Sequence, residues 1–567
     1  MQIQKKIENL IKEVLEGLGV TNPEVHLEHP TEISHGDYSS NVSLLYLRDL
    51  NNPPAGGPRE FAEILVSKIK RPSEVEKIEI AGPGFINFYL SKEFFVEATK
   101  EVLKSKKDFG LNRNLKGQKI IIEYTQPNPF KVFHIGHLVN NIVGEAVSRL
   151  IEAESPKLKR VTYHGDVGLH VAKAIWAMRK NGLNPGILED WGSSYAEGDK
   201  AYEENPEAKK EITDLNKVIY EASDKEVDRL YKLGRDLSLK HFEEIYTRLG
   251  SKFDRNFFES KAGVTGRRIV EDNPNIFQRS QGAIIFPESK SNLHTRVFIN
   301  SEGLPTYEAK DLGLIELKRK FFKFDRSITV TDIEQAEYYK VIVKAAEFVF
   351  PKLIGKIEHL SHGRLRLAEG RMSSRTGNII GGEDLLNQLH ELAIKKMEGR
   401  EIGNKEEVAD QIAVSALKYS ILKQAPGKNI IFDFEKSLSF EGDSGPYLQY
   451  SAVRSKSILE KAKRERIPKF QRLPLDSKGS LWTINEVEKL LYRFPEVVAT
   501  AAREYAPHKV ATYLLELSGA FNSFYAKEKI VDKDDQNSPY KVALTESFLI
   551  TLQNGLNLLG IKVPGKM

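Results

Sequence analysis

The hydrophobic positions near the start of the chain repeat with the period of an amphipathic helix. Apolar side chains occupy positions 3, 7, 10, 11, 14, 15 and 18, three or four residues apart. Three glutamates, Glu8, Glu13 and Glu16, interrupt them, and this acidity is not typical of a signal or transit peptide. We therefore predict a helix over residues 3–18 that belongs to the fold.

A second pattern, the alternation of apolar and polar residues, follows in residues 85–90. The turn-forming sequence Ala-Gly-Pro-Gly at 81–84 precedes it, so we predict a strand with one buried face. The polar stretch 104–117 has the composition of a linker. Together these patterns predict a first domain over residues 1–108.

A third pattern starts at residues 120–122, three consecutive isoleucines of the kind found in buried parallel strands. Strand-like runs at 159–164, 296–299 and 327–331 each precede a helical pattern. Strands alternating with helices predict an α/β domain of Rossmann type, whose ligands bind at the carboxyl ends of parallel strands. We place this second domain at residues 109–400.

Two further regions are predicted to be helical. Residues 189–250 are highly charged with a helical period and interrupt the strand–helix alternation, so we predict a helical insertion there. Residues 401–567 show helical patterns throughout and form a third, all-α domain in this prediction. A length of 567 residues agrees with several domains, because it exceeds what one hydrophobic core supports.

Composition and charge narrow the possible chemistry. The absence of cysteine excludes disulfides, thiolate nucleophiles and zinc sites built from cysteine. No apolar run reaches the roughly 18 residues that indicate a membrane span, so we expect no membrane partner. Residues 454–472 hold eight basic side chains against two acidic ones, which by itself is most often a solvated helix face.

The segment with the clearest chemical indication connects the isoleucine strand to the next helix. The free N–H groups of a helix N-terminus suit a phosphate. His134 and His137, three residues apart, lie on one side of it and can donate hydrogen bonds to phosphate oxygens. Gly136 leaves room for a base or ribose against the backbone. A metal site would need a third ligand and usually an acidic neighbour, and two structural histidines would give the same spacing.

A second polar loop lies at residues 368–378 and reads AEGRMSSRTGN. Two guanidinium groups and several hydroxyls between flanking glycines can form a phosphate clamp. The residues concerned are Arg371, Met372, Ser373, Ser374 and Arg375.

In order and spacing, these two loops resemble the paired H-I-G-H and K-M-S-K-S motifs of class I aminoacyl-tRNA synthetases. Residues 81–90, RVFINSEGLPTYEAKDLGL at 296–314, LSFEGDSGPYLQY at 438–450 and the last nine residues resemble motifs of the arginyl-tRNA synthetase family. The resemblance covers nearly the whole chain. It implies an N-terminal tRNA-binding domain, a catalytic domain and a helical anticodon-binding domain.

The resemblance also implies a reaction. Arginine attacks the α-phosphorus of ATP, which carries Mg²⁺ without a protein-held metal, and the arginyl group then passes to tRNA(Arg). Such an enzyme is expected in the cytoplasm, and we expect a monomer. His134, Gly136, His137 and Lys131 would contact ATP from one side, and residues 371–375 from the other.

Substrate residues follow from the same resemblance. A guanidinium requires a fixed carboxylate, and the resemblance gives that role to Tyr307 and Asp311, with Glu259 as a weaker candidate. The other end of arginine would contact Glu123, Asn128, His134 and Gln335. Contacts to the tRNA D-loop and anticodon are expected from Phe85, Asn87, Tyr447, Gln449, Tyr450, Arg454 and Met567.

At four positions the sequence departs from the family pattern, so the resemblance does not define the pocket wall there. Ser374 replaces a lysine for which Lys131 is expected to substitute, Val167 and His170 replace Trp and Gln, and Tyr338 stands where His is common. Three alternatives remain at this point: a class I synthetase for another amino acid, an inactive RNA-binding relative, and a small-molecule nucleotidyltransferase that shares the H-I-G-H element.

Overall fold

The computed structural model describes residues 2–290, 293–368, 381–399, 401–471, 474–475 and 482–567. Its contacts divide the chain into two compact units, which are described separately. The first unit comprises residues 1–111, 451–498 and 513–554, and the second comprises residues 112–450, 499–512 and 555–567. Within the described residues, no helix is long and apolar enough to cross a membrane.

The first unit contains a small α/β layer built by the N-terminal residues. Helices α1 (Gln2–Gly17), α2 (Val42–Tyr46) and α3 (Gly57–Lys68) pack with an antiparallel sheet of order β1-β3-β2. The strands are β1 (Tyr38–Ser40), β2 (Val75–Ala81) and β3 (Phe85–Leu90). The predicted helix and strand are confirmed, because their apolar residues meet in one core: Ile7, Ile11, Leu15, Ile86 and Phe88.

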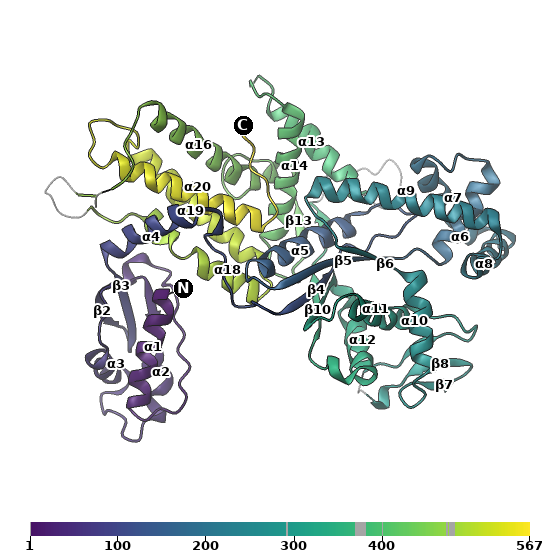
Figure 1. The fold of residues 1–567 in the computed structure, drawn as a ribbon, viewed down its shortest axis with the longest axis horizontal. Helices are drawn as coiled ribbons and strands as arrows, with labels where there is room; N and C mark the ends of the chain where they lie inside the picture. The colour runs from purple at the N-terminus through teal and green to yellow at the C-terminus, as the bar shows by residue number, and fades with distance from the viewer. Residues whose placement is uncertain (1, 291–292, 369–380, 400, 472–473, 476–481) are drawn as a thin grey trace. The chain divides into compact units, whose positions relative to one another are not determined.

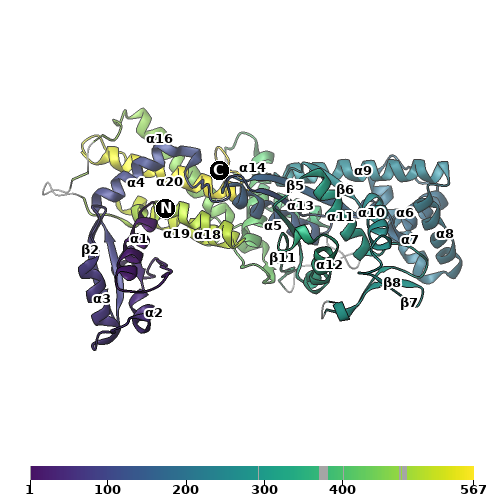
Figure 2. The same cartoon turned by 60° about the horizontal axis from the view of Figure 1, so that its bottom comes forward.

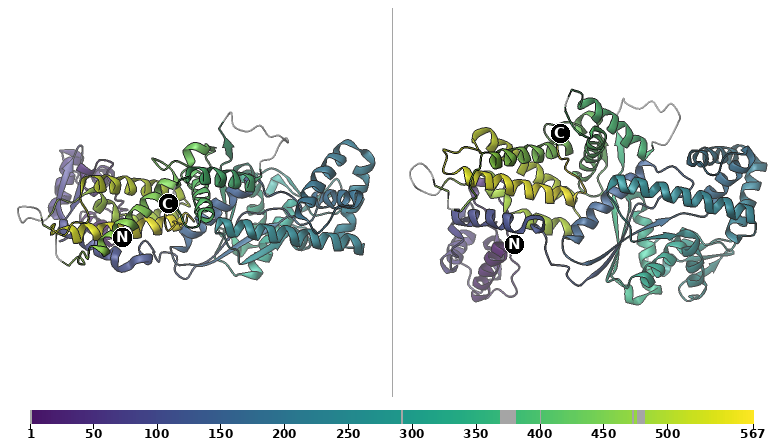
Figure 3. Two further views of the ribbon diagram at one scale, coloured as in Figure 1. Left: turned by 90° about the horizontal axis from the view of Figure 1, so that it is seen from above. Right: turned by 45° about the horizontal axis from the view of Figure 1, so that its top comes forward.

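Helices from both ends of the sequence complete the first unit. They are α4 (Lys92–Ser105), α17 (Glu486–Leu491) and the unit's parts of α16 (Gly445–Arg464), α18 (Phe494–Arg503), α19 (Pro507–Lys527) and α20 (Ser538–Leu558). The amide Nδ2 of Asn554 in α20 donates to the carbonyls of Lys106 (2.8 Å) and Phe109 (2.9 Å), so the end of α4 lies beside α20. Figure 3 shows these blue and yellow helices side by side.

The second unit is built on a five-stranded parallel sheet of order β11-β10-β4-β5-β6. Its strands are β4 (Lys119–Glu123), β5 (Lys157–His164), β6 (Arg255–Phe258), β10 (Arg326–Asp332) and β11 (Ile357–His362). Helix α5 (Ile135–Glu152) covers one side, and α10 (Glu259–Glu271), α11 (Tyr307–Phe321) and α12 (Ala336–Val349) cover the other (Figure 1). The predicted Rossmann-type α/β fold is confirmed, and the strand order reverses between β4 and β10, where such sheets bind ligands.

One predicted strand belongs to a different sheet. Residues 296–299 form β9 (Arg296–Ile299), as predicted, but β9 pairs antiparallel with β8 (Ala283–Phe286), which pairs with β7 (Gln278–Ser280). Placing this strand in the parallel sheet was wrong, because its backbone groups pair with a local hairpin. The C-terminal region is likewise not wholly helical, since β12 (Leu365–Leu367) pairs with β13 (Ile430–Phe432).

The charged region at 189–250 is helical. Helices α7 (Leu188–Glu204), α8 (Pro206–Glu221) and α9 (Lys225–Leu249) occupy it, and they pack with α6 (Leu169–Asn181) around a core that includes Trp191 (Figure 2). Helices α13 (Gly382–Lys396), α14 (Lys405–Leu422) and α15 (Phe434–Ser437) also belong to the second unit. This unit therefore extends past the predicted boundary at residue 400. Short 3-10 turns occur at Ile33–His35, Leu47–Asp49, Lys106–Asp108, Glu288–Lys290, Ile333–Gln335 and Pro351–Leu353.

The loop after β4 has an unusual backbone that α5 and α9 hold in place. Thr125, Gln126 and Phe130 have φ values of +81°, +52° and +67°, in the left-handed region that non-glycine residues rarely adopt. The Thr125 N–H donates to Oδ1 of Asn140 (2.8 Å), and the Phe130 N–H donates to Oγ of Ser238 (3.0 Å). Such strained loops persist when surrounding contacts fix them, and they concentrate at functional sites.

Helices α10 and α11 cross unusually closely because glycines face each other at the crossing. A Cβ added to Gly266 would lie 1.8 Å from the carbonyl oxygen of Ala309, and one added to Gly313 would lie 2.1 Å from that of Ala262. These are backbone atoms that cannot rotate away. The spacing of the two helices therefore depends on the missing side chains.

We predict that Gly313→Ala separates α10 and α11 and lowers the free energy of unfolding of the second unit by at least roughly 1–3 kcal/mol, the usual cost of overpacking. Urea unfolding followed by circular dichroism measures this. Gly192→Ala in α7 is a matched control, since an added Cβ there meets nothing within 4 Å. Equal unfolding midpoints for the two variants would contradict the prediction.

Candidate active site

A cavity of about 810 Å³ opens at the carboxyl ends of the parallel strands, at the point where the strand order reverses. The loop after β4, the start of α5, the start of α11 and the end of β10 supply most of its wall. Among its lining residues are Asn128, His134, Gly136, His137, Tyr163, His170, Glu259, Arg296, Tyr307, Asp311, Asp332, Glu334, Gln335, Tyr338, Tyr339 and Arg364.

The two histidines of the first motif stack on each other at the start of α5. Their ring centroids are 3.6 Å apart, at 22°. His134 is the N-cap residue, and its Nδ1 accepts a hydrogen bond from the Gly136 N–H (3.1 Å), so the proton of the neutral ring lies on Nε2. Burial and then Lys131 lower the pKa of His134, while burial holds the pKa of His137 well below its usual range. Both rings are thus neutral N–H donors at pH 7.

Gly136 has a role that the sequence did not indicate. The predicted ligand contact against its backbone stays a prediction, since Gly136 lines the cavity; in addition, a Cβ at this position would lie 2.9 Å from Cε1 of His134. The missing side chain therefore makes room for the imidazole that caps the helix. The glycine lets His134 fold back over the first turn of α5.

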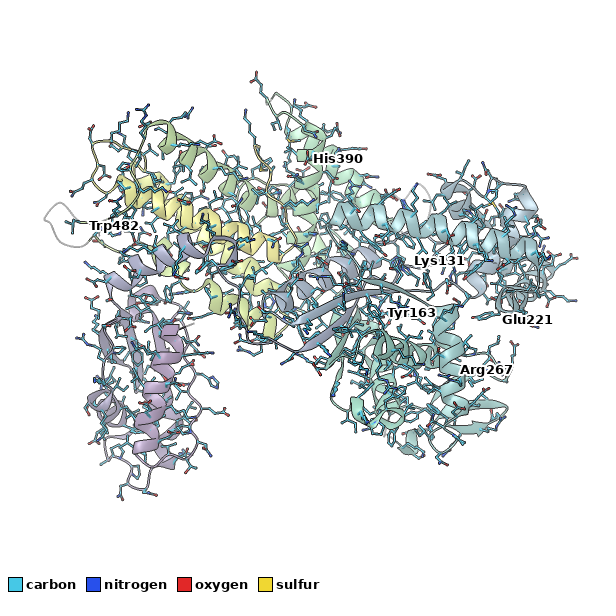
Figure 4. All side chains as sticks on the ribbon, in the orientation of Figure 1. Lys131, Tyr163, Glu221, Arg267, His390 and Trp482 are labelled. Carbon is cyan, nitrogen blue, oxygen red and sulfur yellow. The ribbon has the colours of Figure 1, made fainter. Side chains whose placement is uncertain are left out.

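Lys131, predicted to contact phosphates, does not line this cavity. Its Nζ lies 4.9 Å from the ring centroid of Tyr195 in α7, and Lys131 lines a neighbouring cavity of about 210 Å³. Burial, with a contribution from Lys173, lowers its pKa. Figure 4 labels Lys131 and Tyr163, a residue of the main cavity. The residues of the second motif, Arg371, Met372, Ser373, Ser374 and Arg375, lie outside the described residues.

Acidic side chains in and behind the cavity wall are neutralised by lysines from α11. Glu259 accepts from Nζ of Lys310 at 2.7 Å, and Glu123, which is 1% exposed and does not line the cavity, accepts from Nζ of Lys318 at 2.8 Å. A second oxygen of Glu123 accepts from Nε2 of Gln126 (2.7 Å), which does line the cavity.

Asp311 differs from these carboxylates. Among the described residues, no lysine, arginine or histidine forms an ion pair with it, and its one hydrogen-bond donor is the hydroxyl of Tyr338, 2.7 Å from Oδ2. Burial, reinforced by Glu123 and Glu259, raises the pKa of Asp311 to about 7, although Tyr338 and Lys318 oppose the shift. An ionised Asp311 is therefore poorly compensated, which suits a cationic ligand.

Other predicted substrate residues surround the cavity at different depths. Tyr307, one helical turn before Asp311, is 66% exposed at the cavity mouth. Oδ1 of Asn128 accepts from the Gly165 N–H (3.2 Å), and Gln335 lies in the turn that follows β10. The structure thus brings Asn128, His134, Glu259, Tyr307, Asp311 and Gln335 to one cavity.

Sequence reasoning missed several residues of this region. Arg296 and Lys310 were inside a quoted motif but received no role, and Lys318 lies seven residues after Asp311, on the same side of α11. A lysine on the face of a helix that must be buried is a signal for an internal ion pair. Of the departures from the family pattern, Val167 packs in the core of α6–α9, whereas His170 and Tyr338 line the cavity.

The predicted RNA contacts differ in accessibility. Phe85 is 39% exposed, but Asn87 is 4% exposed and its Oδ1 accepts from the Ser39 hydroxyl (2.7 Å). Tyr447, Tyr450, Arg454 and the C-terminal Met567 are partly exposed. Gln449 is buried, and its Nε2 donates to the carbonyls of Lys562 (2.7 Å) and Gln411 (3.2 Å). The accessible members of the set are thus the aromatic residues, Arg454 and Met567.

Comparison with known families covers almost the whole chain. Residues 98–434 match the family described as tRNA synthetases class I (R), catalytic domain. Residues 1–90 match the arginyl tRNA synthetase N terminal domain, and residues 448–567 match the DALR anticodon binding domain. The chain belongs to the arginyl-tRNA synthetase family. It is accordingly an arginine–tRNA ligase with a class I catalytic domain, as the motifs predicted.

Relatives of this synthetase support the same conclusion. The arginine–tRNA ligase of Borreliella burgdorferi is 29% identical, with 100% of this chain and 99% of the relative aligned. The arginine–tRNA ligase of Clostridium acetobutylicum is 30% identical over 90% of this chain and 91% of its own length. The Thermus thermophilus arginyl-tRNA synthetase structure shares the fold over 100% of both chains, with a TM-score of 0.80 and 24% identity.

The raised pKa of Asp311 predicts how the synthetase responds to pH. Only an ionised carboxylate attracts a guanidinium, so if Asp311 contacts arginine as the motifs predict, its protonation below about pH 7 weakens arginine binding. We expect kcat/KM for arginine to fall up to about tenfold per pH unit below pH 7 and to level off above it. ATP–pyrophosphate exchange between pH 5.5 and 8.5 measures this, and Asp311→Asn should lack the step. A flat wild-type profile would refute the assignment.

Proposed function

We propose that the cavity binds arginine with its guanidinium at Asp311 and its carboxylate beside the α-phosphate of ATP. One observation carries this proposal. Of the described carboxylates that line the cavity, Glu259 pairs with Lys310, and Asp332 and Glu334 both pair with Arg364, whereas Asp311 has no cationic partner among the residues that the structure describes. A planar, permanently charged side chain supplies the missing charge. Tyr307, at the cavity mouth, gives a second polar contact.

At the other end of the substrate, Asn128, His134 and Gln335 contact the α-amino and carboxylate groups. Glu123 was predicted to share this role. Because it lies behind the wall, we propose that it acts through Gln126, whose amide it holds, and does not touch the substrate. Glu259 sets the position of Lys310 and adds negative potential near the guanidinium.

Activation of arginine requires its carboxylate to attack the α-phosphorus in line while pyrophosphate leaves. Nε2–H of His134 and the ring N–H of His137 donate to phosphate oxygens as charge develops there. Lys131 and residues 371–375 supply positive charge from further around the nucleotide. Mg²⁺ accompanies the triphosphate as part of the co-substrate.

Transfer of the arginyl group requires tRNA(Arg). We propose that the 1–108 domain contacts the D-loop through Phe85. Asn87, which is buried, holds strand β3 in place through its hydrogen bond with Ser39 of β1. In the 401–567 domain, Tyr447, Tyr450, Arg454 and Met567 contact the anticodon, and Gln449 anchors the C-terminal tail through Lys562. Exposed aromatic rings suit unpaired bases. All these sites lie in one chain, which favours a monomer, and a translation enzyme of this kind is expected in the cytoplasm.

Asp311→Ala tests the assignment of arginine to the cavity. Removing the carboxylate leaves the guanidinium buried without a counter-charge, so we expect kcat/KM for arginine to fall by the equivalent of roughly 3–5 kcal/mol. Arginine-dependent ATP–pyrophosphate exchange, with and without tRNA, measures it. Asp254→Ala is the control, since Asp254 pairs with Lys159 at the other end of the strands. Wild-type kinetics in Asp311→Ala would eliminate the proposal.

Tyr450→Ala tests the proposed anticodon contact. Loss of a stacking ring costs roughly 1–3 kcal/mol per base, so the KM for tRNA should rise about five- to a hundredfold while the KM for ATP stays the same. Aminoacylation at varied tRNA concentration gives both constants. Tyr450→Phe keeps the ring and should retain most of the affinity. An effect on ATP alone would place Tyr450 elsewhere in the mechanism.

A further inference from the structure

The side chain that touches Asp311 comes from the neighbouring helix α12. The hydroxyl of Tyr338, in α12, donates to Oδ2 of Asp311, in α11, across 2.7 Å. Within the described part of the chain, Oδ1 of Asp311 accepts no hydrogen bond. One oxygen of the carboxylate is therefore held and the other is available to the cavity.

Surrounding groups hold the Tyr338 ring in place. Its ring meets that of Tyr339 edge-on, with centroids 5.3 Å apart, and it packs against the core of α10–α12. The guanidinium carbon of Arg296 lies 5.7 Å from the ring centroid, and Arg296 pairs with Glu308 at 3.6 Å. A ring packed on two sides presents its hydroxyl in a fixed direction.

We infer that Tyr338 is a positioning residue for arginine recognition: its hydroxyl fixes the plane of the Asp311 carboxylate and turns Oδ1 toward the guanidinium. This inference rests on the proposed function, since it requires arginine to bind at Asp311. Tyr338 itself acts through the carboxylate. Its contribution is orientation, together with preference for the ionised form, because a phenol O–H donates best to a charged acceptor.

Orientation matters more for arginine than for other cations. A guanidinium presents its N–H donors in one plane, so it needs acceptor lone pairs that lie in that plane. After Tyr338 has bonded Oδ2, both lone pairs of Oδ1 and one of Oδ2 remain. An ammonium group, such as that of lysine, has no such plane and gains little from a fixed carboxylate. Tyr338 therefore contributes to discrimination between arginine and lysine.

The same hydrogen bond sets the proton affinity of Asp311. Burial and the carboxylates of Glu123 and Glu259 favour the protonated acid, whereas Tyr338 and Lys318 favour the carboxylate. Loss of the Tyr338 hydroxyl removes one of the two contacts that favour the carboxylate, so the pKa of Asp311 rises further. Among the described residues, the charged and titratable groups around Asp311 are Glu123 on β4, Tyr163 on β5, Glu259 on α10, Tyr307 and Lys318 on α11, and Tyr338 and Tyr339 on α12, while Arg296 on β9 lies over the Tyr338 ring.

Tyr338→Phe removes only the hydroxyl. We expect the KM for arginine to rise roughly tenfold or more, as for loss of a hydrogen bond to a charged group, with kcat and the KM for ATP nearly unchanged. The midpoint of the pH profile for arginine should move up by about one pH unit, and lysine should be rejected less strongly. Tyr338→His, which retains an N–H donor, should restore part of the affinity.

A matched control exists at the opposite end of the same strands. The hydroxyl of Tyr505 donates to Oε2 of Glu358 at 2.8 Å, so Tyr505→Phe also removes a tyrosine–carboxylate hydrogen bond from the second unit. It should leave the KM for arginine and the pH midpoint unchanged. Thermal unfolding of both variants compares their stability.

If Tyr338→Phe is unstable, Tyr338→His tests the same contact, and a double-mutant cycle gives a second measurement. In the background of Asp311→Asn, loss of the hydroxyl should change the KM for arginine little further, whereas additive effects would overturn the inference. An unchanged arginine KM and pH midpoint in folded Tyr338→Phe would also overturn it. If Asp311→Ala loses arginine activation and Tyr338→Phe does not, only this inference fails. If Asp311→Ala is itself silent, the proposed function fails.

Discussion

A negative charge that has no cationic partner among the described residues dominates the proposed chemistry of this synthetase. Asp311 is enclosed at the ends of the parallel strands, where desolvation and two neighbouring carboxylates raise its pKa to about 7. Nearby acids escape this cost through lysines of the same helix, Lys310 and Lys318. Such an arrangement is unfavourable in the empty protein, and in the proposed function the guanidinium of arginine relieves it. Substrate charge and protein charge are complementary in this sense.

The backbone around the cavity is built to hold these groups at fixed positions. Left-handed residues after β4 are secured by asparagines of α5 and by a serine of α9, so the loop that carries Asn128 and His134 is tied to two helices. On the opposite wall, glycines allow α10 and α11 to approach closely, which brings Glu259 near Lys310. The strained loop in one wall and the closely packed helices in the other both keep the cavity rigid, and a charged site requires rigid walls to remain selective.

In the proposed function, the phosphate side of the cavity works by different means. Stacked, neutral imidazoles at the start of α5 would donate hydrogen bonds without adding full charges, and the glycine between them leaves room for the His134 ring. Formal positive charge comes from residues further away, including Lys131, whose ammonium lies over Tyr195 of the insertion. Because Lys131 contacts Tyr195 of α7, the helical insertion holds this lysine in the neighbouring cavity.

The amino-acid sequence by itself determined the local elements and the family. Period and alternation gave the first helix, the strands β3, β4, β5 and β10, and the helix α5, because these depend on contacts between near neighbours. Several motifs in order gave arginine activation. The membership of β9 in a separate sheet was missed, since the strand–helix alternation does not show that β9 pairs with the neighbouring hairpin of β7 and β8.

Tertiary structure alone decided which of the predicted polar residues line the cavity and which are buried behind its wall or elsewhere. Glu123, Asn87 and Gln449 match the family pattern as well as Asp311 does, yet the first is paired behind the wall and the other two are buried. Nor does the sequence show that Tyr338, 27 residues from Asp311, holds its carboxylate. Side-chain exposure and charge pairing are set by segments far apart along the chain. They are therefore properties of the packed molecule, which no local pattern encodes.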